Sequence, residues 1–414
     1  MAYDVSELFP YPRNWVDDDT RAIAAAIHKW ADNEIINNRL EYQKAYARLF
    51  NERRRSHNLD IGFQRIIFPE EYGGSGFNSL QKTPALVTIL GELSRADAGM
   101  GFMSALEYSL SAVAAMEPNV NNKICDLIAP LLCGTELKTV SILMPGPGTA
   151  GRDDPLFMGR SISARIEPHR GGYLLNGSGI RPVGNGAIAD IFGVVCANPE
   201  GKAGIALITA DRSGIVRGES IRQTGLDACL NADISFNNTP VPSEHVVMND
   251  DAVRELYTWL NLFLGAVSVG ACLNFFEILR NWAENRTIKG KGLLKNNPLC
   301  ASVLATVAEE IGLAKILVYN ISNFLGRTEV WGGHENPVIF MAAQMFGKRI
   351  QQSALNAINR GMELMASAGY AKEWHAEKHW RDVKTIQSVL CGVASEVPVH
   401  MDMARFFYDS AVVA

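Results

Sequence analysis

The chain has 414 residues, enough for one large domain or two to three modules, and 47% of them are hydrophobic, which is ample for a buried core. Its formal net charge of −5, with no local cluster of Lys and Arg, argues against a nucleic-acid partner. No uninterrupted apolar run approaches the length of a membrane span, and the first residues do not resemble a signal peptide, so we expect no membrane partner. Seven cysteines without a CxxC pair predict reduced thiols, a cytoplasmic location and no metal site.

Residues 1–135 have the pattern of a helical domain. Apolar residues recur at helical spacing over 20–47 and over 80–116. A loop rich in Gly and Pro at 68–76 separates these two stretches, because such a segment cannot be helical throughout. We therefore predict that the chain begins with packed helices.

Residues 136–247 have a different pattern, with short apolar runs bounded by Gly, Asn and Pro, which is typical of a compact β domain. Long helical patterns return after residue 250 and continue to the end of the chain. The order helix, sheet, helix predicts an α+β multidomain protein. Its predicted domains are an N-terminal helical domain at 1–135, a central β domain at 136–247 and a C-terminal helical bundle at 248–414.

Four motifs, in order along the chain, carry a resemblance to a known family. They are FPEEYGGSG at 68–76, GELSRADAG at 91–99, FNNTPVP at 236–242 and RDVKTIQSVLCGV at 381–393. Together they resemble the acyl-CoA dehydrogenase family from the first helical zone to the C-terminal helices. One such motif would be weak evidence, but several in register indicate the fold strongly.

The resemblance implies the architecture of that family: an N-terminal helical domain, a central β-barrel-like domain and a C-terminal four-helix bundle. It implies a homo- or hetero-tetramer, with FAD between the sheet domain and the bundle and its ADP half reaching a neighbouring subunit. The substrate would be an acyl-CoA or an acyl-carrier thioester, and an electron-transferring flavoprotein is a possible electron partner. In the family, a base removes the α-proton while a hydride passes between the β-carbon and the flavin.

The base of the family is the Glu of a Glu-Gly-Thr that follows an Arg-Asp pair. In this sequence we align Cys391 with that Glu and Val393 with the Thr. A thiol has a reference pKa of about 8.5, and apolar burial raises it, so Cys391 is a poor substitute and serves better as a small apolar filler. Some relatives carry the base on the helix that begins the C-terminal bundle, and Leu260 stands at that position here.

Glu107 is the remaining candidate base, because it falls on the helix that lines the acyl pocket in the family. A carboxylate buried there would have a raised pKa and could act on a bulky or cyclic acyl group. The alternative is that Glu107 pairs with an Arg of the helical domain and only shapes the pocket. Asp97 is the second choice.

The positions that resemble the flavin-ring contacts have kept their spacing and lost several functional groups. Leu143 stands where the family has a Thr, and Thr149 keeps a hydroxyl where the family has Ser. Gly184 and Asn185 fall in the next flavin segment, without its aromatic residue and second Thr. We therefore expect an altered ring site.

The positions that resemble the ADP contacts are altered as well. Arg286 matches the Arg of the family, and Asn297 replaces a Gln. Glu363 and Ser367 lie in a motif that usually reads Gln-x-x-Gly-Gly, where Glu363 adds a negative charge near a phosphate and Ser367 adds a side chain.

Three functions follow from these residues. The first is an FAD-dependent oxidoreductase that desaturates an atypical acyl thioester, or reduces it in the reverse direction, with a displaced base. The second is a flavin-poor, non-catalytic partner subunit of a mixed tetramer. The third is an acyl-CoA lyase, of the decarboxylase or desulfinase type, which needs no base but needs an Arg near the acyl tail, with Arg95 and Arg181 as candidates.

Overall fold

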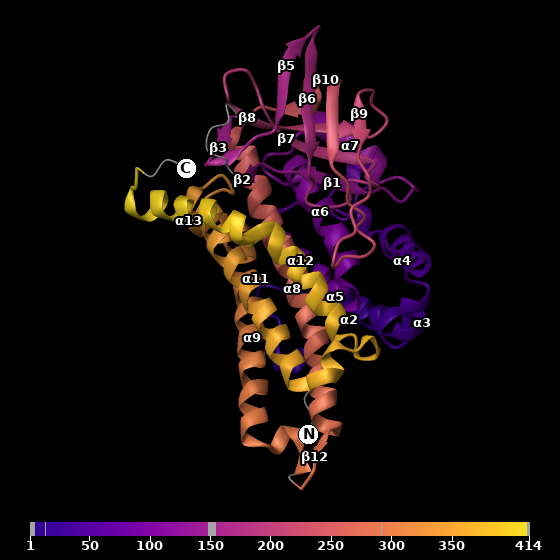
Figure 1. Ribbon diagram of the computed structural model, residues 1–414. Coiled ribbons are helices and arrows are strands. Elements are labelled where there is room, and N and C mark those ends of the chain that lie inside the picture. The colour runs from indigo at the N-terminus through magenta and orange to yellow at the C-terminus, as the bar shows by residue number, and fades with distance from the viewer. Residues whose placement is uncertain (1–4, 13, 148–154, 291, 412–414) are drawn as a thin grey trace.

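A computed structural model of the protein describes residues 5–12, 14–147, 155–290 and 292–411. The chain runs from helices through a sheet region and back into helices (Figure 1), which confirms the predicted fold class. The first strand after the N-terminal helices begins at Val140, and the long helix after the sheet begins at Asp250. The limits of the three domains themselves stay a prediction.

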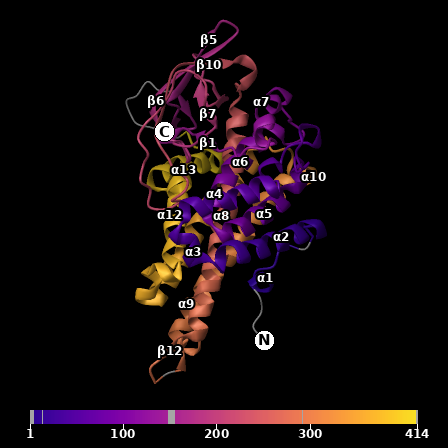
Figure 2. The same cartoon turned by 90° about the vertical axis from the view of Figure 1, so that its right-hand side faces the viewer.

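The N-terminal helices pack along one side of the long helix α8 (Figure 2). Nearly every residue of α5 and all of α6 are buried, because these two helices lie between α8 and the outer helices. Asp97 begins α6, where its side chain accepts hydrogen bonds from the amides of Gly99 and Met100. The helices of this region are α1 (Val5–Leu8), α2 (Asp18–Ala31), α3 (Arg39–Lys44), α4 (Tyr46–Arg55), α5 (Thr83–Ala96), α6 (Ala98–Ala115) and α7 (Asn122–Leu132).

The central region is an eight-stranded sheet at the top of the molecule in Figure 1. Its order is β11-β8-β7-β5-β6-β10-β9, with β1 paired to β7; the pairs that β7 makes with β1 and β5 are parallel and the rest antiparallel. A second small sheet has the order β2-β4-β3. The strands are β1 (Val140–Leu143), β2 (Gly146–Pro147), β3 (Leu156–Phe157), β4 (Arg160–Ser161), β5 (Ala164–His169), β6 (Gly172–Ile180), β7 (Ile191–Ala197), β8 (Ala203–Thr209), β9 (Ile215–Arg217), β10 (Ile234–Pro242) and β11 (Val246–Val247).

The C-terminal helices α8, α9, α11 and α12 pack side by side and extend away from the sheet (Figure 1). One stretch of α8 is apolar enough to cross a membrane, but 83% of that stretch is buried inside the protein, as in a core helix. Helix α13 turns away from the end of α12 toward β2. The elements of this region are α8 (Asp250–Asn285), β12 (Thr287–Ile288), β13 (Gly292–Leu293), α9 (Pro298–Gly326), α10 (Thr328–Trp331), α11 (Pro337–Met365), α12 (Ala376–Cys391) and α13 (Val393–Tyr408).

A buried lysine joins the three parts of the fold. Lys378 of α12 lies 2.6 Å from Asp382, one turn along its own helix, and 3.2 Å from Asp97 at the start of α6. Asp382 in turn accepts a hydrogen bond of 2.7 Å from the amide of Leu226, in the loop between β9 and β10. Burial lowers the pKa of Lys378, but the two carboxylates outweigh that effect and raise it above its usual value.

We predict that Gly225→Ala destabilises the protein by about 1–3 kcal/mol, because the loop packs directly on the backbone of α12. A Cβ at Gly225 would lie 2.2 Å from the carbonyl oxygen of Arg381. Urea unfolding of the purified variant measures the effect. The matched control is Gly91→Ala, since a Cβ at this helical glycine meets no atom within 4 Å, and we expect it to stabilise the protein by up to about 1 kcal/mol. Equal stabilities of the two variants would contradict this packing.

Candidate functional site

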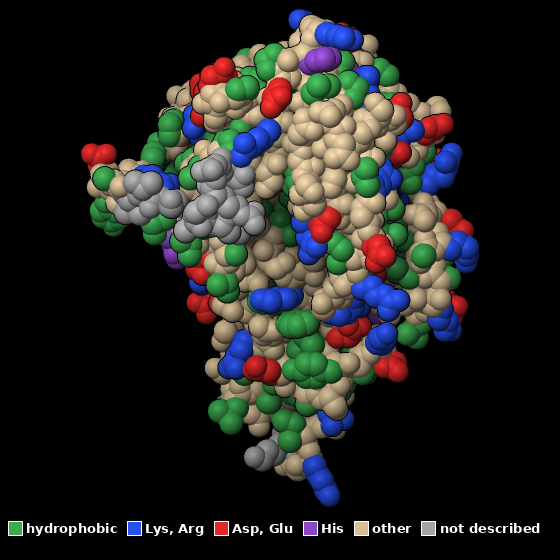
Figure 3. Space-filling view, turned by 45° about the horizontal axis from the view of Figure 1, so that its top comes forward, with side chains coloured by type: hydrophobic (Ala, Val, Ile, Leu, Met, Phe, Trp, Pro, Cys, Tyr) green, Lys and Arg blue, Asp and Glu red, His purple; other side chains and the backbone are tan. Residues whose placement is uncertain are grey.

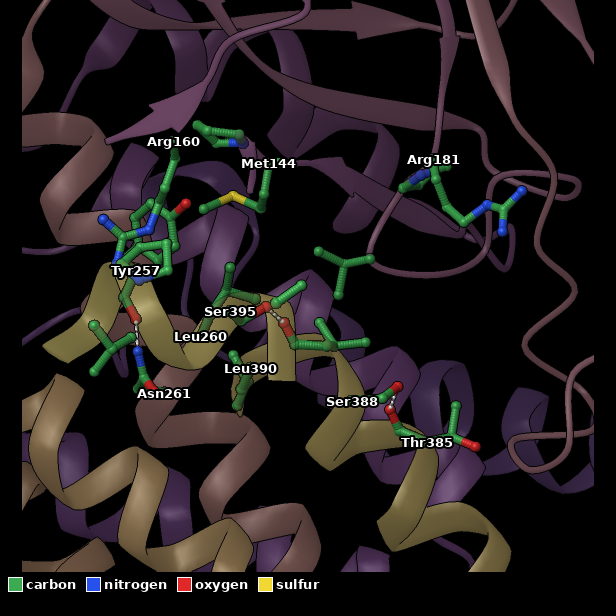
Figure 4. A pocket seen from close by; sticks show the side chains of 18 of the residues that line it. Met144, Arg160, Arg181, Tyr257, Leu260, Asn261, Thr385, Ser388, Leu390 and Ser395 are labelled. Atoms are coloured by element: carbon green, nitrogen blue, oxygen red, sulfur yellow. Dashed lines mark hydrogen bonds between the residues drawn. The ribbon is translucent and has the colours of Figure 1, made fainter. Parts of the chain in front are cut away.

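A cavity of about 430 Å³ lies between the sheet region and the C-terminal helices (Figure 4). The loops after β1, β6 and β9 close it from the sheet side, and α8, α11, α12 and α13 close it from the helical side. The residues that line it are Met144, Pro145, Gly146, Arg160, Arg181, Pro182, Val183, Gln223, Asn231, Tyr257, Leu260, Asn261, Gln344, Thr385, Ser388, Val389, Leu390, Ala394, Ser395, Pro398 and Val399. None of these described residues is Asp, Glu, His, Cys or Lys.

Tyr257 and Arg160 form one end of the cavity (Figure 4). The guanidinium carbon of Arg160 lies 5.3 Å from the centroid of the Tyr257 ring, and the ring of Phe157 stacks on the same tyrosine at 6.1 Å. Arg160 is held by a 2.7 Å ion pair with the fully buried Asp402. Burial raises the pKa of Tyr257 to about 12, and the nearby guanidinium of Arg160 opposes that shift. The phenol therefore keeps its proton at neutral pH.

Two amides lie beside this tyrosine. Asn261 follows it by one turn of α8 and donates a hydrogen bond of 2.8 Å to its backbone carbonyl. Gln344 of α11 is only 3% exposed, and its Nε2 has no hydrogen-bond partner among the described residues. A buried amide without a partner is costly in a dry site. Gln344 therefore suits a ligand that brings a carbonyl oxygen into the cavity.

The other end of the cavity carries Thr385 and Ser388 of α12 and the side chain of Arg181 (Figure 4). Arg181 is bonded to both carboxylate oxygens of Asp233, at 2.7 and 3.0 Å. Of the two candidates for the arginine that an acyl-tail site would need, Arg181 thus lines the cavity. Arg95 does not, because it is buried against Glu277, at 2.7 Å.

Leu260 and Leu390 lie between the two ends (Figure 4). Leu260 is the residue that we aligned with the alternative base of the family. At the other base position, Leu390 lines the cavity and the neighbouring Cys391, which we aligned with the base of the family, does not. The Cys391 thiol lies 3.9 Å from the backbone carbonyl of Lys348 in α11, and burial raises its pKa to about 12. The side chains of adjacent helical residues point about 100° apart, and here Val389 and Leu390 line the cavity while Cys391 lies against α11.

Glu107 does not line the cavity. It is paired with an arginine of the helical domain, which was the alternative to a role as base. Its carboxylate makes a 2.6 Å ion pair with Arg54 and accepts a 3.2 Å hydrogen bond from Asn58, and all three residues are buried. Burial raises the pKa of Glu107, and Arg54 opposes that shift. Asp97, the second choice, is bound to Lys378 and caps α6. Both carboxylates hold helices together away from the cavity.

The positions expected to contact the flavin ring have packing roles. Leu143 is buried in the core of the sheet. A Cβ at Gly184 would lie 2.5 Å from the ring of Phe102, so the glycine makes room for this aromatic residue of α6. Asn185 has a φ of +63° and donates a 2.9 Å hydrogen bond to the carbonyl of Val140. None of these three lines the cavity. Val393 is 89% exposed, and Thr149 lies outside the described residues.

The positions expected to contact the ADP half lie at the opposite end of the bundle. Arg286 ends α8, about 39 Å along the helix from Leu260 at 1.5 Å per residue. Asn297 caps α9, Glu363 makes a 2.8 Å ion pair with Arg360, and Ser367 is exposed. The structure of one chain therefore does not bring these residues to the cavity.

Comparison with known proteins decides the family. The sequence profile of "Acyl-CoA dehydrogenase, N-terminal domain" matches residues 17–117, and that of "Acyl-CoA dehydrogenase, C-terminal domain" matches residues 256–390. The chain belongs to the acyl-CoA dehydrogenase family. This membership supports FAD as the cofactor and the function of an oxidoreductase that acts on acyl-CoA. The unpartnered amide of Gln344 fits a carbonyl group of a flavin or a thioester.

The relatives of this acyl-CoA dehydrogenase-family chain include enzymes with cyclic substrates in their names. The chain is 22% identical to the cyclohex-1-ene-1-carbonyl-CoA dehydrogenase of Syntrophus aciditrophicus (strain SB), over 90% of this chain and 87% of the relative. It is 25% identical to the 3-(aryl)acrylate reductase of Clostridium sporogenes (strain ATCC 15579), over 78% and 82%. Its fold is similar to a glutaryl-CoA dehydrogenase of Mycobacterium smegmatis in complex with FADH2, with a TM-score of 0.78, 18% identity and full coverage of both chains.

The sequence analysis missed Tyr257, Arg160 and Gln344. Tyr257 had a usable signal, because it precedes Leu260 by three residues and so lies on the same face of a helix. The sequence contained no such signal for Arg160 and Gln344, because only the tertiary fold brings β4 and α11 to the cavity.

We predict that Glu107→Gln destabilises the protein by about 3–5 kcal/mol, because it leaves the Arg54 charge buried without its counter-ion. Urea unfolding measures this loss, and the affinity for an acyl-CoA should stay within about twofold. The control is Glu41→Gln, whose partner Lys44 is exposed and which should change stability by less than about 1 kcal/mol. A Glu107→Gln protein of normal stability that no longer binds or turns over a thioester would restore Glu107 as a site residue.

Proposed function

We propose that this protein is an FAD-dependent oxidoreductase that reduces the α,β double bond of an unsaturated acyl thioester. One observation carries the proposal: the described lining of the cavity holds proton donors and no carboxylate. Desaturation requires a base that is unprotonated at neutral pH. The titratable groups on the described wall are Tyr257, Arg160 and Arg181, and arginine is always protonated in proteins. Such a site suits the delivery of a proton better than its removal.

The proposed substrate is a thioester of a cyclic or aromatic acid. Two relatives have names that refer to cyclohexene and aryl acyl groups. The middle of the cavity is walled by Leu260, Val389 and Leu390, which offer apolar surface to a ring. The unpartnered amide of Gln344, at one end of the cavity, suits a carbonyl group of the thioester or the flavin.

The proposed partner-subunit role is the second candidate, and a specific observation favours it. Leu143 and Gly184, at positions that resemble flavin contacts, pack instead against the sheet core and Phe102. Arg286, one of the ADP positions, lies about 39 Å from Leu260 along α8, so FAD would bind across two chains of a homo- or hetero-tetramer. In that case the chain would bind flavin only with its partner. An electron-transferring flavoprotein is the proposed electron donor in either arrangement.

The first experiment is the visible spectrum of the purified chain, followed by anaerobic mixing of the reduced protein with unsaturated thioesters. We expect bound flavin, and faster reoxidation by cinnamoyl-CoA or cyclohex-1-ene-1-carbonyl-CoA than by crotonyl-CoA. A colourless chain that gains flavin only on mixing with a second family member would favour the partner-subunit role. Bound flavin that no unsaturated thioester reoxidises would contradict the reductase.

We predict that Leu390→Glu gains the ability to remove an α-proton, because it places a carboxylate on the cavity wall. The measurement is deuterium uptake from D2O into the α-position of 3-phenylpropionyl-CoA, followed by mass spectrometry at neutral pH.

The matched control for that experiment is Cys391→Glu, one residue along the same helix end. Its carboxylate would point toward the Lys348 carbonyl in α11, so no gain of exchange is expected. Equal gains in the two variants, or a gain only in Cys391→Glu, would contradict the geometry of this wall.

A further inference from the structure

We infer that Tyr257 is the proton donor of this site and protonates the α-carbon of the bound thioester. The inference rests on the proposed reductase function and assigns the catalytic group that neither base position of the family supplies. It depends on where the phenol lies, how it is held and what surrounds it.

Tyr257 reaches the cavity from the same helix face as Leu260, one turn earlier on α8. Leu260 has no acid or base to offer, so the nearest titratable group on this face is the phenol. None of the described residues forms a hydrogen bond with the Tyr257 hydroxyl, whereas its backbone carbonyl is bonded to Asn261. A hydroxyl without a protein partner, at the wall of a cavity, is free to bond a ligand.

The ring is held on two sides. Phe157 stacks on it with an interplanar angle of 6°, and the guanidinium of Arg160 lies 5.3 Å from its centroid. Arg160 is itself fixed, since it donates hydrogen bonds to the carbonyl of Met158 and to Asp402, at 2.9 and 2.7 Å. This arrangement restricts the motion of the phenol, so little further entropy is lost when the proton donor is oriented for the reaction.

Two charged groups act on the phenol, and the positive one has the larger effect on its pKa. Arg160 lies against the ring and stabilises the phenolate that forms when the proton leaves. Asp402 has the opposite effect, but its carboxylate is engaged by Arg160 and by Arg405, at 2.7 and 3.1 Å. The guanidinium thus compensates the charge that develops on Tyr257.

The chemistry balances in electrons and protons. Reduced flavin, when bound, would supply a hydride, with both electrons, to the β-carbon. The electron pair of the C=C π bond would then move to the α-carbon and into the thioester carbonyl. The unpartnered amide of Gln344 can donate to that carbonyl oxygen. The Tyr257 O–H bond then breaks, its proton forms the new α C–H bond, and the phenolate takes a proton from water. The product is the saturated thioester and oxidised flavin.

The test uses the flavin-loaded protein and the variant Tyr257→Phe. We expect its rate of flavin reoxidation by cinnamoyl-CoA to fall by about 10²–10⁴-fold, the usual contribution of a general acid. Affinity for 3-phenylpropionyl-CoA, measured by titration calorimetry, should stay within about twofold, because the ring and its stacking remain. The solvent deuterium isotope effect of the wild type should change in the variant.

The matched control is Tyr108→Phe. Tyr108 also has a buried hydroxyl without a partner among the described residues, but it does not line the cavity. We expect wild-type rates from it. If Tyr257→Phe keeps the wild-type rate, the inference is overturned while the reductase stands. If the wild type itself does not reduce any unsaturated thioester, the proposed function fails and the inference fails with it.

Discussion

The structure depends on one buried charge, the ammonium group of Lys378 between Asp97 and Asp382. These carboxylates come from the start of α6 and from α12, and Asp382 also binds the amide of Leu226 in the loop between β9 and β10. Removing one partner of such a cluster leaves an uncompensated charge in the interior, which costs several kcal/mol. The cluster therefore fixes the N-terminal helices, the sheet region and α12 relative to one another.

The cavity is a consequence of this junction. The loop that Asp382 holds also carries Gln223 and Asn231, and α12 carries Thr385 and Ser388, about one and two turns beyond the cluster. Asp97 and Asp382 are paired with Lys378 and stabilise the fold. The Glu107 carboxylate is likewise paired with Arg54 and does not reach the cavity. What remains on the described wall of the cavity is a set of donors with apolar surface between them. This distribution of charge is the physical reason why we assign proton delivery to the site.

Much of the fold could be predicted from sequence, because local patterns encode it. Helical periodicity, the loop at 68–76 and the ordered motifs gave the correct sequence of helices, sheet and helices, and Leu260 lies on the cavity wall as its alignment indicated. The site was harder to predict. Leu390 and Cys391 are neighbours at the end of α12, and only Leu390 lines the cavity. The direction of each side chain at a helix end cannot be predicted from a pattern in one sequence. The partners of Glu107 and Tyr257, namely Arg54 and Arg160, lie far away along the chain, so only the tertiary fold identifies them.

The pH dependence of α-proton exchange in the wild-type protein tests the central claim most directly. In the reverse direction the base would be the Tyr257 phenolate, and burial raises the pKa of Tyr257 to about 12. Deuterium uptake by a saturated aryl thioester should therefore be slow at pH 7 and rise about tenfold per pH unit up to pH 10, because the phenolate fraction rises in that proportion. An exchange rate that is already high at pH 7 and flat above it would reveal a carboxylate base and contradict the account.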